Sequence, residues 1–486
     1  MKLISQRSFL LRLAVTLTLS CLALRLLSLG LYPLQDTTEA RYAEMARIMV
    51  ETGNWLTPMF DYEVPFWGKP PLFSWLSALG FSLFGVNEFA ARLPHLILAV
   101  SALWLLAQFA TRAGFLSGGE ARRSEQWLCC AVLASSAVFF LIGAAVMTDS
   151  ALLLAITLSM SAFLLHWQRS DKSSMGWGYL FFVGLALGSL AKGPLALVLV
   201  GISIVLWLLP GGRWRQLPHC LPWLSGTALY LALTLPWYIA AEVATPGFLQ
   251  YFIIGEHFLR FVETGWQGDL YGTAHSQPRG KIWLLWCMAT LPWIPLFMWQ
   301  LARRARRYEG PQVRLTEGST YYLVCWMLSP LLLFTFAGNI LWSYVLPAVP
   351  AFALLLVVFQ RQTPLPERCY LAGGITPVLF TILLVVFAFG GGKTSEKPLV
   401  QTWRAVSGEH APLTYLEHRP FSARFYSAGT AKLDSRNLTD YAADMLSATK
   451  VESYIVVSNK VWRSAKPTQC QPLASHRHRT LAYCKW

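Results

Sequence analysis

The sequence predicts a polytopic membrane protein, an all-α bundle of about eleven transmembrane helices followed by a small soluble α/β domain. Of its 486 residues, 55% are hydrophobic and 13% are charged, whereas soluble proteins contain about 25% charged residues. Long apolar runs recur over residues 1–390, and each could cross a hydrocarbon core of ~30 Å. Residues 391–486 instead have the mixed polarity of a soluble domain. The composition therefore predicts two domains, 1–390 and 391–486.

The first apolar run is expected to remain in the protein as a membrane helix. It is longer than the apolar region of a signal peptide, and it lacks a small-residue cleavage site. Two segments outside the spans are long enough to contribute to function, residues 32–92 and 242–281. The predicted spans are roughly 9–31, 93–110, 127–147, 150–166, 175–191, 193–209, 221–241, 282–302, 319–337, 340–359 and 369–390.

The distribution of basic residues predicts the orientation of the bundle. Cytoplasmic loops of membrane proteins are enriched in Lys and Arg. With the N-terminus in the cytoplasm, most loop Lys and Arg fall inside, whereas the short outer turns near 148, 192 and 338 contain only Lys192. An odd number of spans then places the C-terminal domain on the outer side. The net charge of +15 thus follows from topology and indicates no nucleic-acid partner.

The first outer segment is expected to contain two helices. Residues 38–52 have an incomplete apolar face that ends at Gly53, and two prolines open an amphipathic stretch over 70–84. The aromatic, Pro-containing stretch Trp55–Gly68 between them is predicted to be a loop. In the second outer segment, residues 256–261 are expected to be helical.

The C-terminal domain is predicted to contain both strands and helices. Residues 413–416 and 451–458 have the pattern of strands, and residues 437–448 have that of a helix. Cys470 and Cys484 lie in this domain, where an oxidising compartment would let them pair. The other seven of the nine cysteines lie in or beside predicted spans, where a free thiol is a small apolar group.

Three carboxylates on the outer side are candidates for chemistry, namely Asp36, Glu39 and Asp149. Charged residues at the mouth of a membrane bundle are costly, and they are usually kept for catalysis or transport. Asp36 and Glu39 also have the spacing of a capping box, and Asp149 stands where an N-cap would precede the next span. Capping does not exclude catalysis, because a capped helix end holds a carboxylate rigidly, as a general base requires.

Cations on the same side would suit a phosphate group. Lys69, Lys192 and Arg260 could each reach toward lipid head groups, but together they could bind a phosphate or diphosphate. His257 is a candidate base or metal ligand, although a lone His is more often a packed polar residue. No motif demands a cofactor, and a divalent metal at His257 stays an open alternative. No zinc-ligand spacing and no nucleotide-binding loop occurs in the sequence.

A series of short motifs, in consistent order over about residues 20–360, resembles a known family. The series is Asp36-Thr37-Thr38-Glu39-Ala40-Arg41-Tyr42-Ala43-Glu44, Thr52-Gly53-Asn54-Trp55, Phe66-Trp67-Gly68-Lys69-Pro70-Pro71, Ala91-Arg92-Leu93-Pro94, Ala191-Lys192-Gly193-Pro194, Leu235-Pro236-Trp237-Tyr238, Glu256-His257 with Arg260-Phe261, and Tyr344 with Pro347 and Pro350. It is similar to the protein O-mannosyltransferase superfamily of GT-C fold, and most to the bacterial lipid A aminoarabinose transferases. Those enzymes have Glu where this chain has Gly68, and Lys where it has Gly338-Asn339.

The resemblance implies a GT-C glycosyltransferase of the bacterial inner membrane, with its C-terminus in the periplasm. Such an enzyme takes a sugar from an undecaprenyl-phosphate-type donor and transfers it, with inversion, to lipid A, another glycan or a protein. An acid of the Asp36/Glu39 motif would activate the acceptor, and Asp149 would be a second acid lining the cavity. The implied substrate-binding residues are Arg41, Tyr42, Lys69, Lys192, Glu256, His257, Arg260 and Tyr344, of which Lys69, Arg260 and Tyr344 would hold the donor phosphate.

Two other functions fit the same residues. The charges could line the pathway of a transporter or flippase for a lipid-linked sugar, but many transporters contain internal repeats with matched broken spans, and none is visible. A polymerase or ligase of lipid-linked glycans would share the outer-face geometry and use a diphosphate-linked donor. The sequence identifies neither the sugar nor the acceptor.

Overall fold

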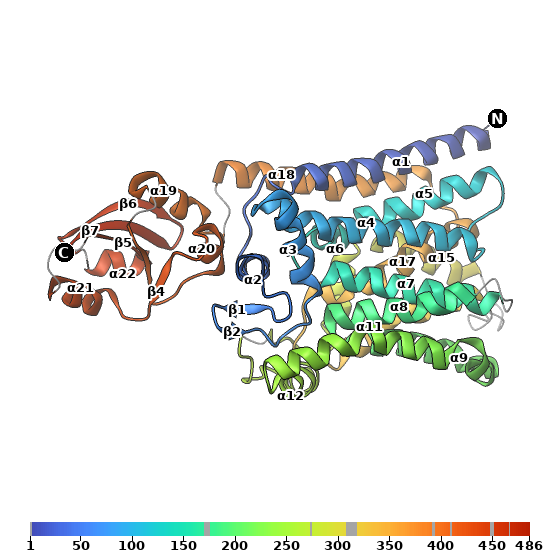
Figure 1. Cartoon of the computed structure of the whole chain (residues 1–486). Helices are drawn as coiled ribbons and strands as arrows, with labels where there is room; N and C mark the ends of the chain where they lie inside the picture. Colours follow the sequence, from blue (N-terminus) through green and yellow to red (C-terminus); the bar gives the residue numbers. More distant parts are fainter. Residues whose placement is uncertain are drawn as a thin grey trace.

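The computed structural model describes residues 2–169, 175–272, 275–307, 318–390, 394–408, 411–447, 452–465 and 467–486. A bundle of helices and a smaller domain of strands and helices lie end to end (Figure 1). The N-terminus lies at the end of the bundle far from the smaller domain. The predicted boundary at residue 391 falls outside the described residues and stays a prediction.

Seven helical segments in the described part of the chain are long and apolar enough to cross a membrane. A bent pair, α14 (Ile282–Ala289) and α15 (Ile294–Arg307), would be an eighth span if counted as one, with a bend of 105°. The seven are α1 (Lys2–Ser28), α4 (Glu88–Arg112), α7 (Asp149–Gln168), α8 (Met175–Lys192), α11 (Trp223–Ala244), η4 with α17 (Trp342–Ala348 and Val349–Gln362), and η5 with α18 (Glu367–Gly374 and Ile375–Gly390).

The remaining three predicted spans are helical but short or broken. Helices α9 (Leu195–Leu208) and α16 (Ser319–Thr335) are apolar but shorter than a full span. The run predicted at 127–147 divides into α5 (Glu120–Ser135) and α6 (Ala137–Ile142), because Ser136 between them is extended, with ψ of 131°. All eleven predicted runs thus contain helix, but the count of eleven spans stays a prediction.

Helix α17 is at the centre of the bundle core, where Val349 through Phe359 are all buried. At the end of the bundle remote from the smaller domain, η2 (Pro210–Gln216) and α10 (Leu217–Cys220) connect α9 to α11. At the other end, α12 (Phe248–Gln250), η3 (Tyr251–Leu259) and α13 (Arg260–Val262) follow α11. The predicted helix at 256–261 is therefore present, and its first part has the wider i to i+5 turn of a π-helix.

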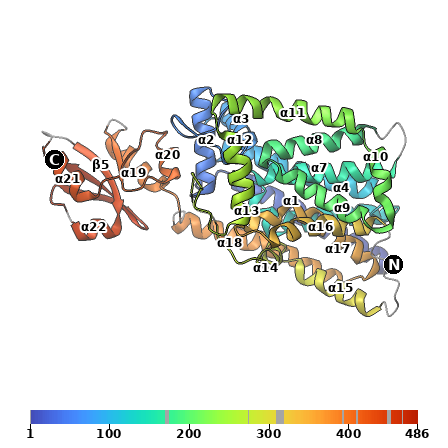
Figure 2. The ribbon, with the colours of Figure 1, turned by 90° about the horizontal axis from the view of Figure 1, so that it is seen from below.

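The first outer segment contains α2 (Thr38–Thr52) and α3 (Leu72–Phe84), which confirms both predicted helices. Between them the predicted loop contains a two-stranded hairpin, β1 (Met59–Asp61) and β2 (Val64–Pro65). Helix α2 ends at Gly53, whose φ of 67° favours a residue without a side chain. Figure 2 shows α2 across the end of the bundle, between the bundle and the smaller domain.

The smaller domain is built on a five-stranded sheet in the order β4-β3-β5-β7-β6. β3 is parallel to β4 and β5, and β7 is antiparallel to β5 and β6. Its elements are α19 (Lys397–Ser407), β3 (Leu413–Leu416), α20 (Phe421–Tyr426), β4 (Lys432–Asp434), α21 (Leu438–Ser447), β5 (Glu452–Ser458), α22 (Asn459–Ala465), β6 (Cys470–His476) and β7 (Arg479–Lys485).

Sequence patterns located β3, α21 and β5 correctly, whereas β4, β6 and β7 were not predicted. Cys470 and Cys484 face each other across β6 and β7 and form a disulfide. This bond ties the edge strand β6 to its neighbour β7, and a crosslink of this kind stabilises a small domain by restricting its unfolded chain.

Candidate active site

A cavity of about 370 Å³, here called the cationic cavity, opens where α2, α7, α8, η3, α13 and η4 meet. It brings together residues that are far apart in the sequence, and its wall includes Phe421 and His418 of the C-terminal domain. Eight of the eleven predicted site residues line it: Arg41, Tyr42, Lys69, Asp149, Lys192, Glu256, Arg260 and Tyr344.

Most charges in the cationic cavity are paired. Lys192 Nζ lies 2.8 Å from Asp149 Oδ1, at the ends of α8 and α7. Lys69 Nζ and Arg260 Nη1 bind the two oxygens of Glu256, at 2.7 and 2.8 Å. Burial alone would raise the pKa of Glu256, but the adjacent Lys69 and Arg260 lower it to about 2. Glu256 is therefore ionised at neutral pH, and it holds two cations at one wall of the cavity.

Arg41 is the cation that lacks an anion. Its Nη1 donates to the carbonyl oxygen of Tyr271 at 2.8 Å, and its buried Nε has no hydrogen-bond partner. The guanidinium lies 5.2 Å from the ring centre of Tyr42 and 5.9 Å from that of Phe421. Among the described residues, Arg41 forms no ion pair. Four Lys and Arg side chains thus face three carboxylates, those of Asp149, Glu256 and Asp269, so the cavity favours a bound anion.

Asp36 lies beside the cationic cavity, at the junction of two further cavities. The first, here called the apolar cavity, has about 460 Å³ and includes Phe380, Leu383 and Leu384 in its wall. The second, here called the C-terminal cavity, has about 220 Å³ and lies against the β6–β7 hairpin. Asp36 lines both of these cavities, and Thr37 lines all three.

The carboxylate of Asp36 is bound by the C-terminal domain. Ser422 donates its backbone N–H to Oδ1 at 3.0 Å and its hydroxyl to Oδ2. The expected N-cap role is wrong, because Thr37 occupies that position and no side chain caps α2. Within the described ranges no Lys or Arg forms an ion pair with Asp36. Burial raises its pKa, and the hydrogen bonds from Ser422 oppose that rise.

Glu39 has a structural partner, Arg92 of α4. Arg92 Nε and Nη2 bind the two oxygens of Glu39 at 2.8 and 2.7 Å. Arg92 is fully buried and also donates to the carbonyl oxygens of Leu29 and Tyr32. Burial acts to raise the pKa of Glu39, but Arg92 outweighs it and lowers the pKa. Both oxygens of Glu39 are already bound by Arg92, so this carboxylate is a poor candidate for a general base.

Glu39 accepts the backbone N–H of Gln35 at 3.2 Å, whereas the expected capping box required the N–H of Asp36, which donates to Thr394 instead. Asp149 is also not an N-cap: Thr148 holds that place, and no side chain caps α7. Both carboxylates are fixed by a cation from another helix, which single-sequence spacing did not reveal. For Glu39, the sequence did contain one signal of such a pair: Arg92 lies at the edge of an apolar run, and a buried Arg needs an anion.

His257 does not line the cationic cavity, although its neighbour Glu256 does. Its Nδ1 is 2.7 Å from the carbonyl oxygen of Phe252, and its Nε2 is 3.1 Å from that of Lys192. A metal ligand needs a nitrogen lone pair, and here both ring nitrogens face acceptors. No group of three or more His, Cys, Asp or Glu that could hold a metal ion occurs in the described part of the chain. The arrangement of His257 fits a packing role better than the metal-ligand alternative.

Several lining residues were missed by sequence reasoning. Asp269, Tyr271 and His275 come from an irregular segment after α13, and His418 and Phe421 come from the C-terminal domain. Tyr271 donates its hydroxyl to the carbonyl oxygen of Pro65 and accepts the N–H of Trp67, so it joins the two outer segments. No local pattern distinguishes such residues, because their role follows from contacts between distant segments.

Comparison with known proteins identifies the fold and relatives. Residues 8–252 match the dolichyl-phosphate-mannose-protein mannosyltransferase family. An undecaprenyl phosphate-alpha-4-amino-4-deoxy-L-arabinose arabinosyl transferase of Shewanella sediminis is 31% identical over 83% of this chain and 71% of its own length. The protein of that name from Edwardsiella ictaluri is 29% identical over 72% of this chain, which spans only 61% of that relative.

The solved structures contain the same architecture. The crystal structure of ArnT from Cupriavidus metallidurans bound to undecaprenyl phosphate superimposes with a TM-score of 0.77. The match covers 96% of this chain and 97% of that one, at 18% sequence identity. It therefore extends over both the helical bundle and the C-terminal domain and shows the GT-C fold predicted from the motifs.

Proposed function

Since the chain belongs to the dolichyl-phosphate-mannose-protein mannosyltransferase family, a family of membrane glycosyltransferases, we propose a specific reaction for it. The protein transfers a sugar from an undecaprenyl-phosphate-type donor to an acceptor on the periplasmic side of the bacterial inner membrane. The N-terminus lies in the cytoplasm, and the C-terminal domain lies in the periplasm. The observation that most supports this proposal is the unpaired Arg41 in the cationic cavity.

In this proposal the donor phosphate occupies the cationic cavity. A phosphate near Arg41 would neutralise the cation that lacks a carboxylate, and Lys69 and Arg260 lie in the same wall. Charge builds up on the phosphate as the sugar–phosphate bond breaks, so preorganised cations lower the barrier. Lys192 Nζ, 4.7 Å from the ring centre of Tyr344, completes the wall beside Asp149.

Asp36 is the proposed general base. It takes the proton from an acceptor hydroxyl, the acceptor oxygen attacks the anomeric carbon, and undecaprenyl phosphate leaves from the opposite face, which inverts that carbon. Of the three predicted acids only Asp36 has no cation in contact among the described residues, and burial keeps its pKa raised. Both properties favour a carboxylate that accepts a proton near neutral pH.

The acceptor is proposed to approach through the apolar cavity. Phe380, Leu383 and Leu384 in its wall suit a lipid-anchored molecule, and Asp36 lines the same cavity. Arg25 also lines this cavity, and two of its buried guanidinium nitrogens have no partner. An anionic group on the acceptor would satisfy them. Lipid A and other anionic glycolipids are therefore preferred over protein acceptors.

The test uses the purified full-length protein in nanodiscs. It is supplied with undecaprenyl-phosphate sugars and with lipid A, and free undecaprenyl phosphate and glycosylated product are measured by mass spectrometry. We expect both products to appear together, with no sugar lipid moved across a sealed bilayer. Translocation without bond formation would support the flippase instead, and turnover only with diphosphate-linked oligosaccharides would support the polymerase or ligase.

Replacement of Arg41 tests the phosphate site. Arg41→Gln is expected to lower kcat/KM for the donor by about 10²–10³-fold, the effect of removing one charged donor to a leaving group. Arg306→Gln, at an exposed position of α15 remote from the cavity, is the matched control. The proposal would be contradicted if Arg41→Gln, with unchanged thermal stability, turned over the donor as well as the control.

A further inference from the structure

Helix α20 of the C-terminal domain binds the short segment that joins α1 to α2. Tyr426 accepts the backbone N–H of Leu34 at 2.7 Å and donates to Glu88 at 2.9 Å. The carbonyl oxygen of Thr394, in the chain that leads into the C-terminal domain, accepts the N–H of Asp36 at 3.1 Å. The backbone on both sides of Asp36 is therefore held by residues that lie beyond the bundle in the sequence.

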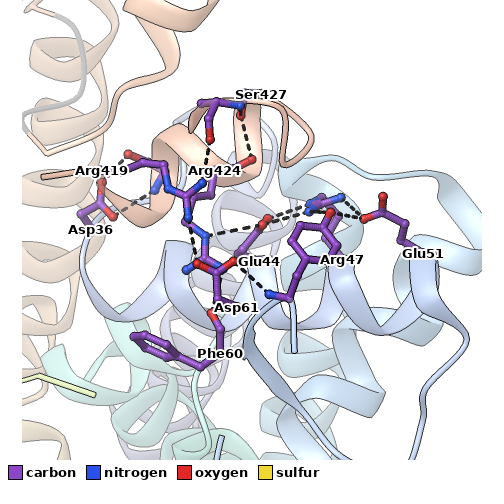
Figure 3. Close-up of polar contacts among 12 residues, drawn as sticks. Asp36, Glu44, Arg47, Glu51, Phe60, Asp61, Arg419, Arg424 and Ser427 are labelled. Atoms are coloured by element: carbon purple, nitrogen blue, oxygen red, sulfur yellow. Dashed lines mark hydrogen bonds and ion pairs between the residues drawn. The ribbon is translucent and has the colours of Figure 1, made fainter. Parts of the chain in front are cut away.

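A buried ionic network fixes α20 against α2 and β1 (Figure 3). Arg424 lies 2.9 Å from Asp61 and 3.9 Å from Glu44, and it donates to the carbonyl oxygen of Phe60 at 2.8 Å. Glu44 also pairs with Arg47 at 2.7 Å. The side chains of Arg424 and Glu44 are 5% and 1% exposed. Charges buried this deeply are stable only in the paired arrangement, so the network fixes where the domain docks.

Ser422 lies two residues before Arg424 on this fixed helix. Its backbone N–H and its hydroxyl bind the two oxygens of Asp36, and the residue is fully buried. The carboxylate has about four lone-pair sites, and the two bonds from Ser422 with the backbone N–H of Phe421 occupy three of them. Ser422 thus fixes the plane of the carboxylate and leaves it able to accept a proton.

We propose that Ser422 is a positioning residue for Asp36, and that the C-terminal domain thereby completes the active site. The inference rests on the proposed role of Asp36 as the base. Phe421, the residue before Ser422, lies 5.9 Å from the Arg41 guanidinium in the wall of the cationic cavity. One turn of α20 therefore contacts both the proposed phosphate site and the proposed base.

A purely structural contact would give a different pattern of effects. If Ser422 only helped to dock the C-terminal domain, removing its hydroxyl would change turnover in the same way as any other substitution that loosens docking. A positioning residue should specifically change the ionisation and orientation of Asp36. Because the hydroxyl of Ser422 acts to lower the pKa of Asp36, its removal raises that pKa, and the ionised base then requires a higher pH.

The experiment compares Ser422→Ala with Tyr426→Phe in the full-length protein. Tyr426→Phe removes docking contacts to Leu34 and Glu88 but leaves both hydrogen bonds from Ser422 to Asp36 in place. We expect Ser422→Ala to lower kcat about tenfold with unchanged KM for the donor, and to shift the acidic limb of its pH profile upward. Tyr426→Phe should leave that limb in place, as should Ser464→Ala at an exposed site of α22.

Two results would overturn the assignment: an acidic limb unchanged in Ser422→Ala, or an equal shift in Ser422→Ala and Tyr426→Phe. A readout independent of turnover is the pH dependence of carbodiimide labelling at Asp36, followed by peptide mass spectrometry. This labelling reports the pKa of Asp36 in each variant, and it does so even when no substrate pair is active. Asp36→Asn separates the two proposals, because full activity in that variant rejects Asp36 as the base whatever Ser422 does.

Discussion

Asp36→Asn is expected to abolish sugar transfer while the protein still folds, inserts and binds the donor. A positioned general base contributes about 10²–10⁴-fold to rate, and kcat should fall by that factor. KM for the donor should change little, because Asp36 does not line the cationic cavity. The fold should persist, because an Asn side chain can still accept from the backbone N–H of Ser422 and donate to its hydroxyl. Single-turnover rates with saturating donor measure the effect.

The pH profile of the unaltered protein should also report the ionisation of Asp36. Burial raises the pKa of Asp36, and a base acts only when it is deprotonated. Turnover should therefore decline as the pH falls through that raised pKa, and this acidic limb should be absent from the residual activity of Asp36→Asn. Asp440→Asn, on an exposed part of α21, is the control for loss of a carboxylate. Normal turnover in Asp36→Asn would reject the assignment.

Glu39→Gln should cause a comparably large effect of another kind, a loss of stability. Arg92 would remain fully buried without its anion, and breaking a buried ion pair in this way costs about 3–5 kcal/mol. The folded-state pKa of Glu39 is lowered, so its stabilising effect is present above the ordinary pKa of a Glu. That effect is lost as the pH falls through the lowered value. Thermal unfolding in detergent, followed by intrinsic fluorescence, measures both results.

The double variant Glu39→Leu/Arg92→Met separates stability from catalysis. Replacing both charges with apolar groups removes the unpaired ion, so this variant should be more stable than Glu39→Gln. It should also regain part of the transfer activity, since Asp36 is retained. A stable Glu39→Gln protein that cannot transfer sugar would instead identify Glu39 as the general base of the Asp36/Glu39 motif.

The sequence predicted those features that depend on local pattern. Apolar runs located the membrane helices, Gly53 ended α2 as expected, and the motif residues Arg41, Lys69, Asp149 and Arg260 converge on one cavity. The strands β3 and β5 were found because Leu413, Tyr415 and Leu416, and the run 454–457, have the aromatic and apolar composition of strands. In contrast, polar residues such as Gln471, Thr480 and Lys485 interrupt β6 and β7, which therefore give only a weak signal.

The partners of Asp36 and Glu44 could not be predicted, because Ser422 and Arg424 lie more than 300 residues away in the sequence. Helix α2 has an incomplete apolar face since it is buried on two sides, by the bundle and by the C-terminal domain. Glu44, a charged residue near the middle of α2, is completely buried beside Arg47. The spacing of Asp36 and Glu39 resembled a single motif, whereas the fold directs Asp36 toward Ser422 and Glu39 toward Arg92.

The position of the donor phosphate can be measured in a structure of the protein in nanodiscs with bound undecaprenyl phosphate. We expect the phosphate within hydrogen-bonding distance of Arg41, and of Lys69 or Arg260, in the cationic cavity, with the polyprenyl chain leaving toward the lipid. Asp36 should then lie on the side of the sugar position opposite the phosphate. A phosphate bound outside this cavity, or one separated from Asp36 by a closed wall of protein, would contradict this expectation.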